Sequence, residues 1–190
     1  FMVKSKIRKS LLEQGQLLPN EFISKNDLKI QSTVLNKVDL ASSKNNLLYF
    51  PYKKEIRLDH IIEEIRVNSN NIYMPKIFSN KNMKFNLLSK DSILKANKYG
   101  IKEIENTEYL EPGLFDTMFI PFVGVDINGS RLGYGGGYFD RALEGISLLN
   151  KRPLIIGMGF DYQIVNEEFG MSYDVKYDIV ITENRVLNFS

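Results

Sequence analysis

The stretch Arg131-Leu132-Gly133-Tyr134-Gly135-Gly136-Gly137-Tyr138-Phe139-Asp140-Arg141 decides the fold prediction, because it contains four glycines within five residues, with an arginine at each end. The apolar segment 115–123 precedes it and is typical of a buried strand, and residues 138–149 are typical of a helix. Glycines between a strand and a helix let backbone N–H groups turn toward an anion, and the helix N-terminus adds partial positive charge. The stretch therefore predicts a phosphate site beyond the carboxyl end of one strand of an α/β sheet.

Apolar runs alternate with amphipathic segments along the rest of the chain, which predicts a mostly parallel sheet covered by helices on both faces. We expect a single domain over residues 2–190, and we interpret Phe1, which precedes Met2, as a cloning remnant. Residues 76–113 are expected to form one or two short hairpins around 83–88 and then loop. Helices are expected at 3–18, 24–42, 58–67 and 138–149. Strands are expected at 47–50, 72–74 (stopped by Pro75), 115–123, 154–158, 177–182 and 186–189.

Composition excludes several classes of function. The net charge of +2 gives no electrostatic case for nucleic acid or a membrane surface. Cysteine is absent, which removes disulfides, thiolate metal sites and cysteine nucleophiles and fits a reducing cytoplasm. The single histidine, His60, has no second histidine or cysteine with which to build a zinc site. No apolar run approaches the roughly 20 residues that span a bilayer. We therefore expect a cytoplasmic protein, which we take to be a monomer.

Known phosphate motifs do not match the glycine stretch. The P-loop requires a glycine, then four residues of any type, then Gly-Lys-Ser/Thr, and no such sequence occurs. The dinucleotide fingerprint Gly-x-Gly-x-x-Gly matches at Gly133 and Gly135 but fails at Tyr138. A flexible turn between strand and helix is the simpler alternative, but four glycines flanked by Arg131 and Asp140 favour an anion cradle, in which Asp140 would hold Mg²⁺ against the phosphates.

The segment 126–141, with the strand 119–125 that leads into it, resembles the signature of the 5-formyltetrahydrofolate cyclo-ligase family, also called methenyltetrahydrofolate synthetases. Weaker elements occur in the same order along nearly the whole chain. They are Lys4-Ser-Lys6-Ile-Arg8, Glu55-Ile56, Tyr99-Gly100-Ile101, 157–163, and Asp174 with Asp178. The resemblance implies a three-layer α/β/α sandwich with a mostly parallel central sheet. It also implies Mg²⁺- and ATP-dependent closure of 5-formyltetrahydrofolate to 5,10-methenyltetrahydrofolate, with release of ADP and phosphate.

The resemblance also assigns residues, with ATP and the folate as the partners of one site. Arg131, Tyr138 and Asp140 are the expected catalytic residues, and Asp140 and Asp174 the expected Mg²⁺ ligands. The expected ATP contacts are Lys4, Arg8, Arg131, Gly133, Tyr134, Gly135, Gly136, Gly137, Tyr138 and Phe139. The expected folate contacts are Phe50, Glu55, Tyr134, Gly135, Gly136, Gly137 and Tyr138.

Alternatives to this interpretation stay open. Tyr134 and Gly136 stand where related sequences often carry Arg or Lys, and this lighter charge is the one feature that favours a non-catalytic folate- or nucleotide-binding regulatory domain. A sugar-phosphate isomerase or CoA transferase of related architecture would need an acid/base pair, for which Asp161 and Glu183 are the nearest candidates. Phe50 is as well suited to the core as to a ligand wall, and Asp174 and Asp178 could simply flank a turn.

Overall fold

The computed structural model describes residues 2–190, so the interpretation of Phe1 lies outside the described residues. The helices are α1 (Met2–Gln16), α2 (Asn20–Lys37), α3 (Asp59–Val67) and α4 (Tyr138–Ala142). The strands are β1 (Asn45–Leu47), β2 (Asn71–Ile77), β3 (Met83–Leu88), β4 (Leu94–Ala96), β5 (Lys102–Ile104), β6 (Thr117–Phe119), β7 (Gly124–Val125), β8 (Arg131–Leu132), β9 (Leu154–Met158), β10 (Ile179–Ile181) and β11 (Val186–Asn188). In this part of the chain no helix is long and apolar enough to cross a membrane.

Seven of these strands form the central sheet, in the order β11-β10-β9-β6-β1-β2-β3. The five inner strands are parallel to one another, and the edge strands β3 and β11 are antiparallel to their neighbours. The chain moves from β1 to β2 on one side and later from β6 to β9 and β10 on the other. The direction therefore reverses between β1 and β6, and ligands of open α/β sheets bind beyond the carboxyl ends of the strands at such a point.

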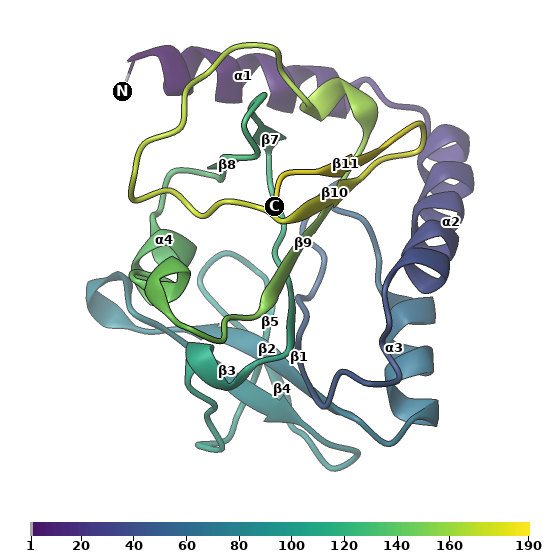
Figure 1. Cartoon of the computed structure of the whole chain (residues 1–190), viewed down its shortest axis with the longest axis vertical. Helices are drawn as coiled ribbons and strands as arrows, with labels where there is room; N and C mark the ends of the chain where they lie inside the picture. Colours follow the sequence, from purple (N-terminus) through teal and green to yellow (C-terminus); the bar gives the residue numbers. More distant parts are fainter. Residues whose placement is uncertain (1) are drawn as a thin grey trace.

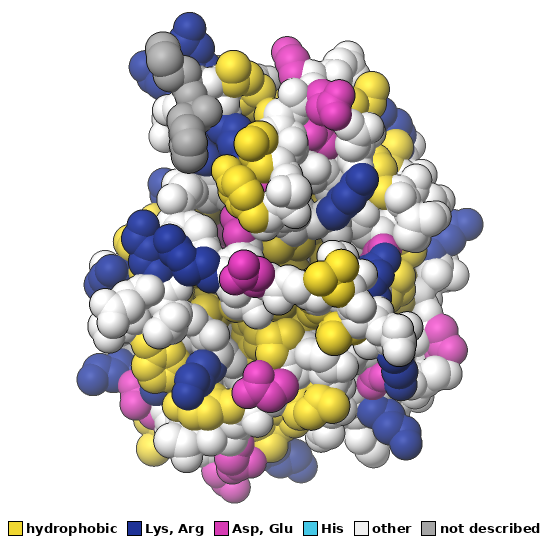
Figure 2. Space-filling view, turned by 60° about the vertical axis from the view of Figure 1, so that its left-hand side comes forward, with side chains coloured by type: hydrophobic (Ala, Val, Ile, Leu, Met, Phe, Trp, Pro, Cys, Tyr) yellow, Lys and Arg dark blue, Asp and Glu magenta, His cyan; other side chains and the backbone are white. Residues whose placement is uncertain are grey.

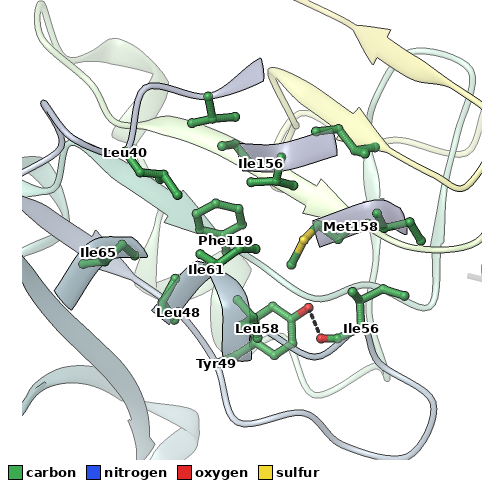
Figure 3. Close-up of a cluster of buried hydrophobic side chains, with 14 of the residues drawn as sticks. Leu40, Leu48, Tyr49, Ile56, Leu58, Ile61, Ile65, Phe119, Ile156 and Met158 are labelled. Carbon is green, nitrogen blue, oxygen red and sulfur yellow. Dashed lines mark hydrogen bonds between the residues drawn. The ribbon is translucent and has the colours of Figure 1, made fainter. Parts of the chain in front are cut away.

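Helices and turns cover both faces of the sheet (Figure 1). Successive residues of the inner strands alternate between two buried clusters, as the period of a strand requires. The cluster beneath α2 and α3, shown in Figure 3, receives Leu48, Phe119 and Ile156. The opposite cluster, beneath α4, receives their neighbours Leu47, Met118 and Ile155. This arrangement confirms the α/β fold and the mostly parallel central sheet expected from the sequence.

Helix α1 lies outside this sandwich and packs on the small hairpin β7–β8. Leu11 of α1 forms a separate buried cluster with Val123, Leu132 and Phe169. Figure 1 shows α1 crossing above β7 and β8, at the end of the sheet where the glycine stretch begins. The packing brings the basic residues of α1 toward the residues that follow β8.

Several expected boundaries were wrong. The helix expected at 138–149 ends at Ala142, because the chain turns at Gly145, whose φ is 77°. Pro75 does not stop β2, because β1 pairs with β2 only as far as Tyr73, so the missing N–H of Pro75 faces no partner strand. The region 76–113 is also more ordered than expected, since it forms β3 and a second hairpin, β4–β5. Helix α2 begins at Asn20, four residues before the expected start.

Candidate functional site

A cleft of about 760 Å³ opens at the carboxyl ends of β1 and β6. The segments that follow these two strands form its two facing walls, and the hairpins β2–β3 and β4–β5 close one side. Figure 2 shows a hollowed face with apolar side chains in its depth and Lys and Arg side chains near its rim. All the site residues expected from the sequence line this cleft: Lys4, Arg8, Phe50, Glu55, Arg131, Gly133, Tyr134, Gly135, Gly136, Gly137, Tyr138, Phe139, Asp140 and Asp174.

The stretch requires glycine for two different structural reasons. Gly135 and Gly137 have φ values of 101° and 72°, a region that side chains disfavour. At Gly133 and Gly136 a Cβ atom would lie 2.7 Å from the Arg131 guanidinium and 2.8 Å from the Tyr138 ring. The first pair therefore permits the turn, and the second pair permits two cleft side chains to approach the backbone closely.

Arg131 is the central cation of this wall. Its side chain is buried, its Nε donates to the Pro121 carbonyl oxygen at 2.6 Å, and its guanidinium lies 4.9 Å from the centre of the Phe139 ring. Within residues 2–190 no carboxylate forms an ion pair with it. A buried cation without a counterion is costly, so this arrangement provides for an anion that enters from the cleft.

A second guanidinium comes from α1. Arg8 Nε donates to the Gly133 carbonyl oxygen at 2.7 Å, and the side chain lies beside Gly135. Burial, together with the charge of Arg131, lowers the pKa of Arg8 below its usual value. Two like charges held this close repel each other, and an anion between them would relieve the repulsion. Since α4 has only five residues, its dipole adds less than the sequence suggested, and the arginines supply most of the positive charge.

Asp140 and Asp174 lie on neighbouring pieces of backbone. Asp140 Oδ1 accepts from the Val175 N–H at 3.0 Å, and Asp174 Oδ2 accepts from the Met171 N–H at 2.7 Å. Asp174 also pairs with the Lys4 ammonium, which lies 5.5 Å from the centre of the Tyr173 ring. In the described part of the chain no group of three or more acidic or histidine side chains is arranged to hold a metal. Mg²⁺ commonly uses one or two carboxylates with phosphate oxygens and water, and these two carboxylates fit that mode.

The opposite wall carries Glu55. Its carboxylate accepts from the Tyr52 N–H at 2.8 Å, and burial raises its pKa to about 7, with that hydrogen bond and the charge of Arg131 opposing the rise. The Tyr52 ring meets the Tyr134 ring edge-on at 5.5 Å, so the two walls touch at their outer rim. A half-ionised carboxyl beside aromatic rings suits a flat ligand that carries N–H donors.

The sequence prediction missed the side of the cleft formed by the β2–β3 and β4–β5 hairpins. Ile77, Met83 and Ile101 add apolar surface there, and Tyr99 lines the opening with them. The motif Tyr99-Gly100-Ile101 was the available signal, but the pairing of β4 with β5 was not expected.

Other candidates lie outside the cleft. Asp161 pairs with Arg185, and Glu183 accepts from the Asp161 N–H, so each carboxylate is engaged in a local turn. Asp178 pairs with Arg152 at the opposite end of the sheet. Phe139 is buried in the core beneath α4, with its ring against Arg131. It therefore supports the cation as well as lining the cleft.

Fold and site together define an α/β protein with an arginine-lined cleft at the switch point of its sheet. The family model described as the 5-formyltetrahydrofolate cyclo-ligase family matches residues 2–183. A 5-formyltetrahydrofolate cyclo-ligase of Haemophilus influenzae is 31% identical over 152 residues, covering 77% of this chain and 80% of the relative. That of Mycoplasma genitalium is 29% identical over 180 residues, covering 94% of this chain and 96% of the relative.

Solved structures agree with these sequence matches. The 5,10-methenyltetrahydrofolate synthetase of Aquifex aeolicus superposes with a TM-score of 0.82 at 26% identity, covering 98% of this chain and 93% of that one. The enzyme of the same name from Mycoplasma pneumoniae gives a TM-score of 0.78 at 26% identity, covering 95% of this chain and 98% of that one. The chain belongs to the 5-formyltetrahydrofolate cyclo-ligase family, and the family resemblance expected from the sequence is confirmed.

Proposed function

We propose that this chain converts 5-formyltetrahydrofolate to 5,10-methenyltetrahydrofolate, using ATP and Mg²⁺ and releasing ADP and phosphate. Family membership supports the reaction. The observation that carries the ATP requirement is the pair of guanidinium groups, Arg131 and Arg8, that face the glycine loop without a carboxylate partner in the described chain. A monomeric state and a cytoplasmic location stay predictions of the sequence.

The chemistry requires activation of a formamide, which is a poor electrophile. The formyl oxygen attacks the terminal phosphorus of ATP, an O–P bond forms, and the bond to ADP breaks. Nitrogen 10 then attacks the formyl carbon and loses its proton, and the C–O bond breaks as phosphate departs. Phosphoryl transfer of this kind depends on positioning and charge stabilisation. Arg131 and Arg8 would hold the transferring phosphoryl group, and no enzyme nucleophile is needed.

The folate would lie between the two walls. Glu55 would accept hydrogen bonds from N–H donors of the pterin, and the apolar residues of the cleft, Phe50 and Met83 among them, would cover its rings. Tyr138, whose ring packs close to Gly136, would orient the formyl group toward the glycine loop. The pterin end and the phosphate end would then meet at Arg131.

Asp140 and Asp174 would hold Mg²⁺ together with phosphate oxygens. When bound there, the ion would neutralise charge on the phosphates. Because Lys4 pairs with Asp174, the ammonium group has to move aside or share that carboxylate with the ion. Lys4 would then be free to contact phosphate, as the sequence resemblance implies.

A spectrophotometric assay tests the proposal. Purified protein is mixed with 5-formyltetrahydrofolate and Mg-ATP, and the near-ultraviolet absorbance of the methenyl product is followed. We expect a rise that requires both ATP and Mg²⁺. Tight binding of folate and ATP without any rise would instead support the non-catalytic regulatory domain. A rise without ATP would contradict the proposed role of the arginine pair.

A further inference from the structure

Helix α3 begins without a cap of its own. The residue before it, Leu58, has no side chain that accepts a hydrogen bond, and the first N–H groups of a helix lack partners within the helix. Two buried side chains of α2 hold the backbone here: Gln31 caps the first turn of α3, and Asp27 holds the residue before Leu58. Asp27 Oδ1 accepts from the Arg57 N–H at 3.1 Å, and Gln31 Oε1 accepts from the His60 N–H at 2.9 Å. Helix α2 thus caps the start of α3 from a neighbouring element.

The Asp27 carboxylate is engaged on both oxygens. Arg57 Nε donates to Oδ2 at 2.7 Å, and Gln31 Nε2 donates to Oδ1 at 3.3 Å. The Asp27 side chain is 2% exposed, whereas that of Arg57 is 54% exposed. Loss of the carboxylate would leave the part-buried Arg57 N–H without its acceptor, whereas loss of the exposed guanidinium would leave the backbone bond to Asp27 in place.

The backbone that Asp27 holds leads directly into the cleft wall. Residues 48–58 connect β1 to α3, and none of them belongs to either element. On the inner side the Tyr49 hydroxyl donates to the Ile56 carbonyl oxygen at 2.8 Å, as Figure 3 shows. On the outer side the anchor is Asp27, through Arg57, two residues after Glu55. Asp27 itself does not line the cleft.

We propose that Asp27 is a positioning residue of the cleft, which holds Glu55 and its wall in the folate-binding position through the backbone of Arg57. The effect on substrate rests on the proposed function, because it requires that Glu55 contacts the folate. The effect on the Glu55 side chain itself does not. The two parts can therefore be measured separately.

Steady-state kinetics test the effect on substrate. Asp27→Ala is expected to raise KM for 5-formyltetrahydrofolate about tenfold, the size of one backbone N–H left without its acceptor, while kcat changes less than about threefold. Asn26→Ala is the matched control, because Asn26 is also buried on α2 but donates within the helix to the Phe22 carbonyl oxygen. Arg57→Met removes the ion pair and keeps the backbone bond, so its KM should stay near that of the wild type. Should Asp27→Ala fail to fold, Asp27→Asn keeps one acceptor oxygen and should give a smaller rise.

Carboxyl ¹³C NMR of the protein without ligands tests the effect on Glu55, with Glu55→Gln to assign its signal. The wild-type carboxyl should titrate with a pKa of about 7, and Asp27→Ala should lower this pKa because water reaches a loosened wall. The other groups that face Glu55, namely the Arg131 guanidinium and the hydroxyls of Tyr49, Tyr134 and Tyr177, are unchanged by the substitution.

The two measurements separate the possible failures. Asp27→Ala with the wild-type Glu55 titration and wild-type KM, and a melting temperature lowered as in Asn26→Ala, would overturn the inference and leave Asp27 with a purely structural role. A wild type without any turnover would overturn the proposed function, and the Glu55 titration would still decide whether Asp27 positions this wall.

Discussion

Each end of the central sheet carries an arginine, buried in the case of Arg131 and partly exposed in the case of Arg152, and the two arginines are used differently. At the amino ends of β9 and β10, the Arg152 guanidinium pairs with both oxygens of Asp178, which also accepts from the Ile155 N–H at 2.8 Å. At the carboxyl ends, Arg131 meets backbone carbonyl oxygen and an aromatic ring but no carboxylate in the described chain. A cation held away from water needs a compensating charge. Asp178 supplies that charge for Arg152, whereas the charge of Arg131 is available to a bound anion.

The same contrast applies to the acidic side chains. Asp178 is compensated by Arg152, and Asp116, which precedes β6, accepts from the Asn45 N–H at 3.0 Å and so ties two strand starts together. At the other end Glu55 is half-buried without an ion pair in the described residues, and desolvation raises its pKa to about 7 although the charge of Arg131 opposes the rise. Uncompensated charge of both signs gathers at one end of the sheet, which is where functional sites concentrate perturbed groups.

The largest expected effect comes from the uncompensated arginine. Arg131→Met should lower kcat/KM by about 100-fold to 1,000-fold, the cost of removing one preorganised group that stabilises transition-state charge. Its melting temperature should stay near that of the wild type, because no internal ion pair is lost. The measurements are the methenyl assay and a thermal melt. Activity that survives this substitution would remove Arg131 from the phosphate site.

The compensated arginine should give the reverse result. Arg152→Met leaves Asp178 buried and unpaired, and we expect the free energy of unfolding to fall by about 2 kcal/mol, less than for a fully buried pair because Arg152 is partly exposed. The kcat/KM should change less than about twofold. Urea unfolding and the same assay measure both quantities. If Arg152→Met lost much of its activity but kept its stability, Arg152 would not be a purely structural arginine, and the contrast with Arg131 would be wrong.

Two glycines with positive φ allow a similar comparison between the cleft and the rest of the fold, with a smaller expected effect on activity. Gly135 in the cleft and Gly145 after α4 have φ values of 101° and 77°, and an added Cβ atom meets no heavy atom closer than 3.4 Å at either position. Alanine should therefore cost about 1 kcal/mol of stability at both positions. Only Gly135→Ala should raise KM for ATP, by about fivefold, because it alters the loop beneath Arg8. An equal change in KM for both variants would show that the backbone at Gly135 has no special relation to phosphate.

The last prediction concerns Glu55, whose raised pKa should make the stability of the protein depend on pH. Its folded-state pKa of about 7 lies above the ordinary value of 4.5, so the folded protein retains a proton that the unfolded chain has released. The wild type should therefore lose stability, relative to Glu55→Gln, as the pH rises from about 4.5 through about 7, and the difference should be constant above that range. Urea unfolding at a series of pH values measures it. Parallel curves for the two proteins would contradict the raised pKa.

Local patterns predicted the sheet well, and long-range contacts account for part of the errors. Residues 154–158 were expected as a strand and form β9 over that range. The wrong end of α4 depends on the positive φ of Gly145, and the passage of β2 through Pro75 depends on how far β1 extends beside it. Gly145 was a local signal for the end of α4 that the prediction overlooked, whereas the extent of β1 cannot be read from the residues around Pro75. The β4–β5 hairpin was missed for a related reason, since both strands are short and polar.

The candidate site was predicted from a local motif and completed by the fold. The glycine stretch and its resemblance to the family named the residues that line the cleft, because binding phosphate requires bare backbone and fixed cations close together in sequence. The partners of those residues were not predictable in the same way. Arg8 meets Gly133 across 125 positions of the chain, and Asp27 meets Arg57 across 30.

By itself, the sequence determined the class of fold, the family and the composition of the glycine-rich loop, because apolar periodicity and glycine content act over a few residues. Only the tertiary structure decided which charges are compensated. Whether an arginine stabilises the fold or provides for a ligand depends on whether a carboxylate reaches it from elsewhere in the chain. Asp178 reaches Arg152, and in the described chain no carboxylate reaches Arg131.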